Sequence, residues 1–164
     1  MKKAVFLDRD GVINEDSGYV SKIADFHFID GVFEALKGFS DLGFLLIIVT
    51  NQSGISRGFY TLEEFEILNS FMLGEFQKNG ILIDKVYFCP HSPEENCECR
   101  KPKAGMILRA LSEFDIDPDK SILIGDKPSD IQAANLANLA KSYQIGKDGA
   151  SLNEIYKHIK KDLQ

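Results

Sequence analysis

The sequence lacks any apolar run close to the roughly 20 residues that a membrane-spanning helix needs. Its first apolar run, residues 4–7, ends at Asp8 and is shorter than the about 7–15 residues of a signal-peptide core. We therefore expect a cytoplasmic protein with no membrane partner. Internal repeats, low-complexity tracts and Gly/Ser linkers are also missing, and 164 residues suffice for one hydrophobic core. We expect a single domain that spans residues 1–164.

Basic residues are too few to favour a nucleic-acid partner. The chain has 19 lysines and arginines against 25 acidic residues, which gives a formal net charge of −6. A net-acidic surface repels the phosphate backbone of nucleic acids. A phosphorylated small molecule is still compatible with this charge, because a few local cations and a metal ion override the overall sign. Hydrophobic residues make up 44% of the chain and charged residues 27%, which excludes disordered and fibrous classes.

Short apolar runs alternate with segments of helical spacing. The runs cover residues 4–7, 44–49, 86–88 and 122–124, and the helical segments cover residues 32–42, 62–78, 104–114, 129–136 and 152–161. Residues from 142 onward are expected to add a strand before the last helix. Thr61 lies three residues before Glu64, which predicts a capping box at the start of the second helix. Strands that alternate with helices predict an α/β fold, a parallel sheet with helices on both faces.

Charged and hydroxyl side chains follow the predicted strands. The first strand is followed by Asp8-Arg9-Asp10-Gly11, the second by Thr50-Asn51-Gln52-Ser53, the third by a cysteine-rich loop and then Arg100-Lys101, and the fourth by Asp126-Lys127, with Asp130 shortly after. Ligands of such folds bind beyond the carboxyl ends of the strands. Each of these short motifs alone is most often a turn, a cap or surface charge. Their occurrence together, each after a strand, favours a catalytic site.

Three converging carboxylates repel one another, so their clustering predicts a bound cation. Mg²⁺ suits oxygen ligands and is usually held by a few carboxylates together with substrate phosphate. One carboxylate can then attack phosphorus, and a second, two residues on, can protonate the leaving oxygen and later activate water. Thr50 and Lys101 are suited to stabilise the phosphoryl oxygens.

This set of residues resembles the four motifs of the haloacid-dehalogenase superfamily of phosphohydrolases, and the resemblance extends from Phe6 to about Ala134. It implies a Rossmann-like three-layer fold and a phosphoaspartate mechanism. Asp8 would be the nucleophile and Asp10 the general acid/base, and Thr50 and Lys101 would stabilise the phosphoryl group.

The resemblance also implies how magnesium is held. The ligands would be Asp8, the carbonyl of Asp10 and Asp126, with Asp130 supporting them from behind. Many members of the superfamily carry a large cap domain, but here only about twenty residues separate Asp10 from the first helix. We therefore expect an open site without a large cap.

All three cysteines lie within eleven residues, around one histidine. The four side chains Cys89, His91, Cys97 and Cys99 suit a closed, tetrahedral zinc site. The alternative is ordinary reduced thiols beside a surface histidine, since a reducing compartment disfavours disulfides. We expect a structural Zn²⁺ that braces the loop (89–99) inserted after the third strand.

The zinc loop narrows the resemblance to heptose-bisphosphate and histidinol-phosphate phosphatases. Residues 8–14, 18–20 and 50–55, together with Arg57-Gly58 and Lys127, resemble the heptose group, whereas the short spacing between His91 and Cys97 resembles the histidinol group. By this resemblance the substrate contacts are Asp16, Ser17, Gly18, Tyr19, Asn51, Gln52, Ser53, Arg100 and Lys127. Arg100 offers a bidentate fork for a phosphate remote from the metal, whereas Lys101 acts as a point charge.

The leading hypothesis is a Mg²⁺-dependent monomeric phosphatase that removes the 7-phosphate of D-glycero-D-manno-heptose 1,7-bisphosphate, a step of surface-glycan synthesis. One alternative is a histidinol-phosphate phosphatase, although a cationic amine would prefer an acidic rim to Arg100 and Lys127. A polynucleotide 3′-phosphatase is disfavoured by the acidic balance. The last alternative is a non-catalytic zinc-bearing interaction domain, which the intact catalytic positions disfavour.

Overall fold

The apolar runs form the centre of the molecule, a parallel sheet. In the computed structural model, which describes residues 1–146 and 150–164, the sheet has the strand order β3-β2-β1-β4-β5. The strands are β1 (Lys3–Leu7), β2 (Phe44–Asn51), β3 (Lys85–Cys89), β4 (Ile122–Gly125) and β5 (Lys141–Gln144). Neighbouring strands pair in parallel throughout these residues, as predicted from the alternation of strands and helices.

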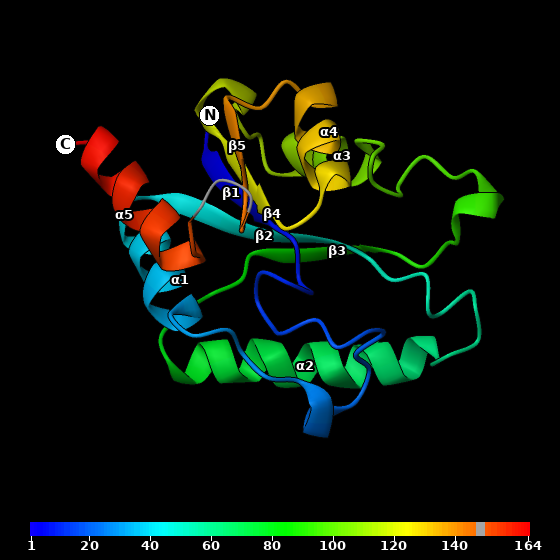
Figure 1. The fold of residues 1–164 in the computed structure, drawn as a ribbon. Helices are drawn as coiled ribbons and strands as arrows, with labels where there is room; N and C mark the ends of the chain where they lie inside the picture. Colours follow the sequence, from blue (N-terminus) through cyan, green and yellow to red (C-terminus); the bar gives the residue numbers. More distant parts are fainter. Residues whose placement is uncertain (147–149) are drawn as a thin grey trace.

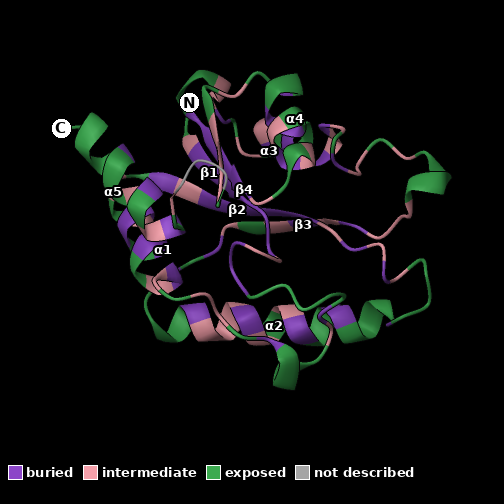
Figure 2. Cartoon of the chain, in the orientation of Figure 1, coloured by how far each residue is buried: buried purple, intermediate pink, exposed green. Residues whose placement is uncertain are grey.

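Helices cover both faces of the sheet (Figure 1). They are α1 (Val32–Asp41), α2 (Leu62–Lys78), α3 (Gly105–Glu113), α4 (Pro128–Leu136) and α5 (Leu152–Asp162). Alternate residues of β1 face opposite layers: Val5 belongs to the core with α1, α2 and α5, and Phe6 to the core with α3 and α4. The burial colours show the same division, with buried residues along the strands and on the inner helix faces (Figure 2). The predicted three-layer α/β/α architecture is confirmed.

The segment between β1 and α1 forms part of the core and not a cap. Val12, Ile13, Val20 and Phe26 are buried and pack in the same cluster as α2, and only a short 3₁₀ helix, Ile23–Asp25, interrupts the loop in this range. Within the described residues, this segment therefore forms no cap domain over the carboxyl ends of the strands. None of the described helices is long and apolar enough to cross a membrane.

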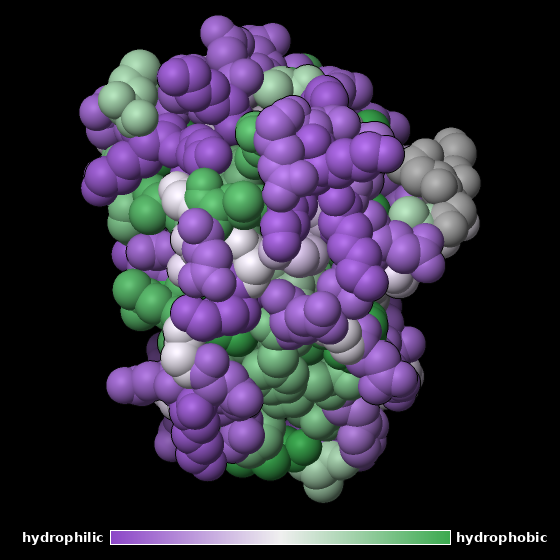
Figure 3. Space-filling view, turned by 90° about the vertical axis from the view of Figure 1, so that its left-hand side faces the viewer, coloured by the Kyte–Doolittle hydropathy of each residue, from purple (hydrophilic) through white to green (hydrophobic). Residues whose placement is uncertain are grey.

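The strand order places a switch point beside β1. The chain passes from β1 to β2 on one side, and β4 joins β1 on the other, so the loops after β1 and β4 diverge above adjacent strands. Ligands bind at such points in open α/β sheets. The side of the molecule away from the loop after β3 is seen in Figure 3, where polar residues cover much of the surface and hydrophobic residues gather in the lower half.

Candidate active site

A buried lysine joins two carboxylates at the carboxyl edge of the sheet. Lys101 Nζ lies 3.0 Å from Asp8 Oδ1 and 2.6 Å from Asp130 Oδ1, and it also donates to the Val49 carbonyl at 2.8 Å. Asp8 follows β1 directly, and Asp130 lies in the first turn of α4. Lys101 is 4% exposed and Asp130 1% exposed, so water screens this ion triad very little. The predicted nucleophile and the predicted phosphoryl-stabilising lysine are therefore in direct contact.

Burial dominates the electrostatics of Asp8. It raises the pKa of Asp8 to about 8, although Lys101 acts in the opposite direction. Burial also raises the pKa of Asp126. For Lys101, burial lowers the pKa, but the neighbouring carboxylates Asp8 and Asp130 outweigh it and raise the pKa overall. Without a further cation, the site thus has more negative groups than Lys101 alone can stabilise.

The carboxylates are arranged in a way that fits a bound cation. Oxygens of Asp8, Asp126 and Asp130 all lie within 4.8 Å of one another. Asp126 Oδ1 is buried and has no hydrogen-bond partner among the described residues, as expected for a ligand atom. Asp130 is already engaged by Lys101 and by the backbone amides of Asp126 and Lys127, each 3.1 Å from Asp130 Oδ2. Asp8 and Asp126 therefore have more carboxylate lone pairs available to a cation than Asp130 has.

Three side chains hold the carboxylate of Asp10. Arg9 Nη2 donates to both oxygens, at 3.0 and 3.2 Å, Asn14 Nδ2 donates at 3.0 Å, and Gln52 Nε2 donates at 3.1 Å. The Arg9 guanidinium is 1% exposed and also donates to the Val20 carbonyl. Asp10 is thus fixed at the edge of the cavity, outside the group formed by the other three carboxylates.

The residues after β2 connect the two halves of the site. Gln52 Nε2 also donates to Thr50 Oγ1 at 2.9 Å, and Gln52 Oε1 accepts a hydrogen bond from the Tyr60 hydroxyl. The side chain of Asn51 pairs with the backbone of Lys101, with both hydrogen bonds 3.1 Å long. Asn51 thereby positions Lys101, and Gln52 links Thr50 to Asp10.

These groups open into a cavity of about 580 Å³. Most of the predicted substrate-contacting residues line it: Asp16, Gly18, Tyr19, Asn51, Gln52, Ser53, Arg100 and Lys127. Ser17 is exposed and is not among the lining residues. At the rim, Lys127 Nζ lies 3.9 Å from Asp16 Oδ2, so these two predicted contacts partly neutralise each other.

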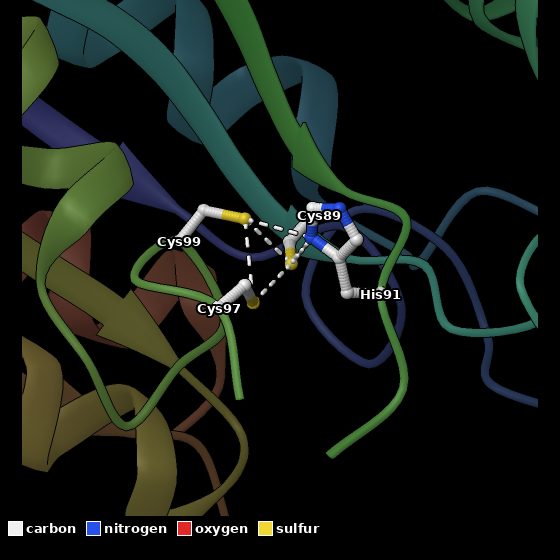
Figure 4. A group of neighbouring side chains, drawn as sticks. All are labelled: Cys89, His91, Cys97 and Cys99. Carbon is white, nitrogen blue, oxygen red and sulfur yellow. Dashed lines mark hydrogen bonds between the residues drawn. The ribbon is translucent and has the colours of Figure 1, made fainter. Parts of the chain in front are cut away.

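The three cysteines and the histidine converge as predicted (Figure 4). Their donor atoms all lie within 4.8 Å of one another, with His91 Nδ1 at 3.4 Å from Cys89 Sγ and 3.3 Å from Cys99 Sγ, and Cys97 Sγ at 3.5 Å from Cys89 Sγ. Donors of a tetrahedral zinc, about 2.0–2.3 Å from the metal, are separated by roughly 3.5–3.8 Å. The separation of Cys89 Sγ and Cys99 Sγ, 2.8 Å, is shorter than this range, and the other three separations lie near it. Burial raises the pKa of the Cys97 thiol, but hydrogen bonds from the Arg100 backbone and from Cys89 outweigh it and lower the pKa to about 6. A thiolate at neutral pH suits a zinc ligand.

Several residues around the site are not among the predicted site residues. Arg9 and Asn14 hold Asp10, Tyr60 holds Gln52, and Arg57 lines the cavity. Arg9 was visible in the sequence as a charged residue between two aspartates. Its function depends on side-chain contacts that local sequence does not reveal.

Comparisons with known proteins agree with this geometry. Residues 98–143 match the model of the HAD-hydrolase-like family. The chain is 51% identical over 164 residues to the D-glycero-alpha-D-manno-heptose-1,7-bisphosphate 7-phosphatase of Campylobacter jejuni, covering 98% of this chain and 94% of the relative. It is 53% identical over 132 residues to the corresponding beta-anomer enzyme of Helicobacter pylori, covering 80% and 76%.

Solved structures agree as well. The D,D-heptose 1,7-bisphosphate phosphatase of B. bronchiseptica, crystallised with magnesium and phosphate, superimposes with a TM-score of 0.89 at 26% identity. That similarity covers 98% of this chain and 99% of the other. The two chains thus share one fold over nearly their whole lengths.

Proposed function

The chain belongs to the heptose-1,7-bisphosphate 7-phosphatases of the haloacid-dehalogenase-like hydrolases, and we propose that it removes the 7-phosphate of D-glycero-D-manno-heptose 1,7-bisphosphate. It is thus a phosphoric monoester hydrolase, and this reaction fits lipopolysaccharide biosynthesis. The observation that supports the proposal most directly is the buried contact of Lys101 with Asp8, in a cavity whose rim is cationic.

The reaction proceeds in two steps on Asp8. A carboxylate oxygen of Asp8 forms a bond to phosphorus, and the bond from phosphorus to the C7 oxygen of the sugar breaks. Asp10 gives its proton to that oxygen, which leaves as the sugar hydroxyl. Asp10 then takes a proton from water as the water attacks the phosphoaspartate, which releases inorganic phosphate and regenerates Asp8.

The surrounding residues stabilise charge and fix geometry. Lys101 and Thr50 stabilise the negative oxygens of the transferred phosphoryl group. Arg9, Asn14 and Gln52 keep the Asp10 carboxylate in position for both proton transfers.

Magnesium is the cofactor that this carboxylate group fits. Asp8 and Asp126 would hold it, together with the Asp10 carbonyl that the family resemblance implies. Asp130 supports the arrangement by binding Lys101 and the amides after β4. The chemistry that Mg²⁺ supplies when bound is neutralisation of negative charge on the phosphate and the nucleophile. The buried, unpartnered Asp126 Oδ1 supports this assignment.

A structural zinc ion completes the proposal. Cys89, His91, Cys97 and Cys99 would be its four ligands, which would leave no open coordination position. We further propose one phosphatase domain over residues 1–164 that acts as a cytoplasmic monomer, since the cysteines are unpaired and the site needs no second chain to form.

Phosphate release with Mg²⁺ tests the function. The substrates are both anomers of heptose 1,7-bisphosphate, histidinol phosphate and a 3′-phosphorylated oligonucleotide, because the related enzymes are named for either anomer. We expect a strong preference for the bisphosphate and no turnover by Asp8→Asn. Faster turnover of histidinol phosphate or of the oligonucleotide would refute the assigned substrate, and full activity of Asp8→Asn would refute the phosphoaspartate mechanism.

A further inference from the structure

A second arginine lines the cavity besides Arg100. Arg57 lies in the loop after β2, and its guanidinium is exposed at the rim. Arg57 Nε donates to Ser53 Oγ at 3.3 Å, and its backbone amide donates to the Ser53 carbonyl at 2.9 Å. The side chain therefore has a defined attachment at the edge of the cavity, beside a residue already assigned to substrate.

Arg57 and Arg100 differ from the other cations of the cavity in their partners. Lys101 is held by two carboxylates, and Lys127 lies 3.9 Å from Asp16 Oδ2. In the part of the chain that the structure describes, neither guanidinium has a carboxylate oxygen within 4.0 Å; Arg100 Nη1 donates only to the His91 carbonyl, at 3.4 Å. Two arginines without acidic partners on one cavity are suited to bind an anionic group of a ligand.

The loops that carry the two arginines are tied together. Ser56, the residue before Arg57, donates from its hydroxyl to Glu95 Oε2 at 2.9 Å and from its backbone amide to the Pro90 carbonyl at 3.2 Å. Glu95 and Pro90 belong to the loop with the Cys/His cluster, which ends at Arg100. The spacing between Arg57 and Arg100 is therefore set by direct contacts between their loops.

A glutamate lies in the turn beside the cavity. Glu94 belongs to the exposed turn Pro93–Glu95, and Pro93 of this turn lines the cavity. The backbone amide of Glu94 and the Ser92 hydroxyl lower the pKa of Glu94, and the charges of Arg57 and Arg100 act in the same direction. Glu94 is thus an ionised group that weakly compensates the two guanidinium groups without forming a close ion pair.

We propose that Arg57 joins Arg100 in binding the phosphate that is not cleaved, the 1-phosphate. The proposal rests on the proposed function, because it requires a substrate with two phosphates. One phosphate occupies the carboxylate site with Lys101, so the second needs its own cations. Two guanidinium groups match a phosphate dianion in charge and offer bidentate hydrogen bonds.

The test compares substrates with and without the 1-phosphate. Steady-state kinetics are measured on heptose 1,7-bisphosphate and heptose 7-phosphate with wild-type protein, Arg57→Gln, Arg57→Lys, Glu94→Gln and, as a control, Arg109→Gln, which removes an exposed arginine on α3. For Arg57→Gln we expect KM for the bisphosphate to rise about tenfold, equivalent to about 1.4 kcal/mol, with kcat unchanged. KM for heptose 7-phosphate should stay within about twofold, because an exposed charge such as Arg57 contributes little to binding where it has no direct partner.

The remaining variants make the result specific. Arg57→Lys should recover part of the bisphosphate KM, Glu94→Gln should lower it about twofold, and Arg109→Gln should leave it unchanged. An equal rise of KM for both substrates in Arg57→Gln, or no rise for either, overturns the proposal while the proposed function stands. Failure of the wild-type protein to hydrolyse the bisphosphate overturns both. A thermal melt of each variant verifies that it is folded.

Discussion

Replacement of Lys101 by methionine tests whether the buried ion triad supports folding as well as catalysis. Methionine matches the length of the lysine stem but leaves Asp8 and Asp130 without the cation that lies 3.0 and 2.6 Å away. Removal of one partner from a buried ion pair costs about 3–5 kcal/mol. Because the pKa of Asp8 is raised to about 8, Asp8 already holds a proton at pH 7 in most metal-free molecules. The cost therefore falls mainly on Asp130, and we expect the lower end, about 3 kcal/mol. For a domain of this size that lowers Tm by roughly 6–12 °C.

Urea denaturation in Mg²⁺-free buffer at pH 7 measures the change in the free energy of unfolding. The matched control is Lys37→Met, because Lys37 pairs with Asp41 at 3.2 Å but both side chains are more than half exposed. That exposed pair contributes about 0–1 kcal/mol. In the same experiment kcat of Lys101→Met should fall about 10²–10³-fold, as for loss of one charge-stabilising donor. A destabilisation below about 1 kcal/mol, or one equal to that of the control, would refute the importance of the buried triad.

Two further predictions concern the metals. The folded-state pKa of Asp8, raised to about 8 from 3.8, means that folded metal-free protein retains a proton that the unfolded chain releases. The stability that this proton contributes is complete below about pH 4 and declines as pH rises to about 8. We therefore expect Mg²⁺ to raise Tm more at pH 8 than at pH 6. Equal shifts of Tm at both pH values would contradict this prediction. Zinc analysis of purified protein should give one equivalent per chain, and Cys97→Ser should lower both the zinc content and Tm; a zinc-free wild-type protein of unchanged stability would exclude the structural site.

The sequence predicted the secondary structure closely because each element has a strong local signal. The predicted helix ends differ from the observed ends by at most one residue, and the strand ends by at most two. The capping box at Thr61 and Glu64 formed as expected, with Glu64 N donating to Thr61 Oγ1 at 3.1 Å. Parallel strands between helices leave few topologies, so the local pattern also determined the layer arrangement.

The site residues that could be predicted from the sequence are those whose own side-chain group suggests a chemical role. Asp8, Lys101 and Asp130 were recognised by type and by their place after strands, and they converge although Lys101 is 93 residues from Asp8. Arg9 and Tyr60 were not recognised, because their role lies in what they touch. The guanidinium of Arg9 is enclosed between the rings of Phe26 and Phe65, each 5.8 Å away, and no local pattern specifies that environment.

The position of the cysteine cluster shows what the proposed zinc ion would do beside this site. Cys89 is the last residue of β3, and Cys99 directly precedes Arg100 and Lys101. A zinc ion bound by both Cys89 and Cys99 would tie both ends of the loop to the edge of the sheet. The loop contains few buried apolar side chains of its own, so packing alone does little to hold it. Under the proposed assignment, coordination would supply the rigidity that keeps Lys101 against Asp8 and presents Arg100 to the cavity.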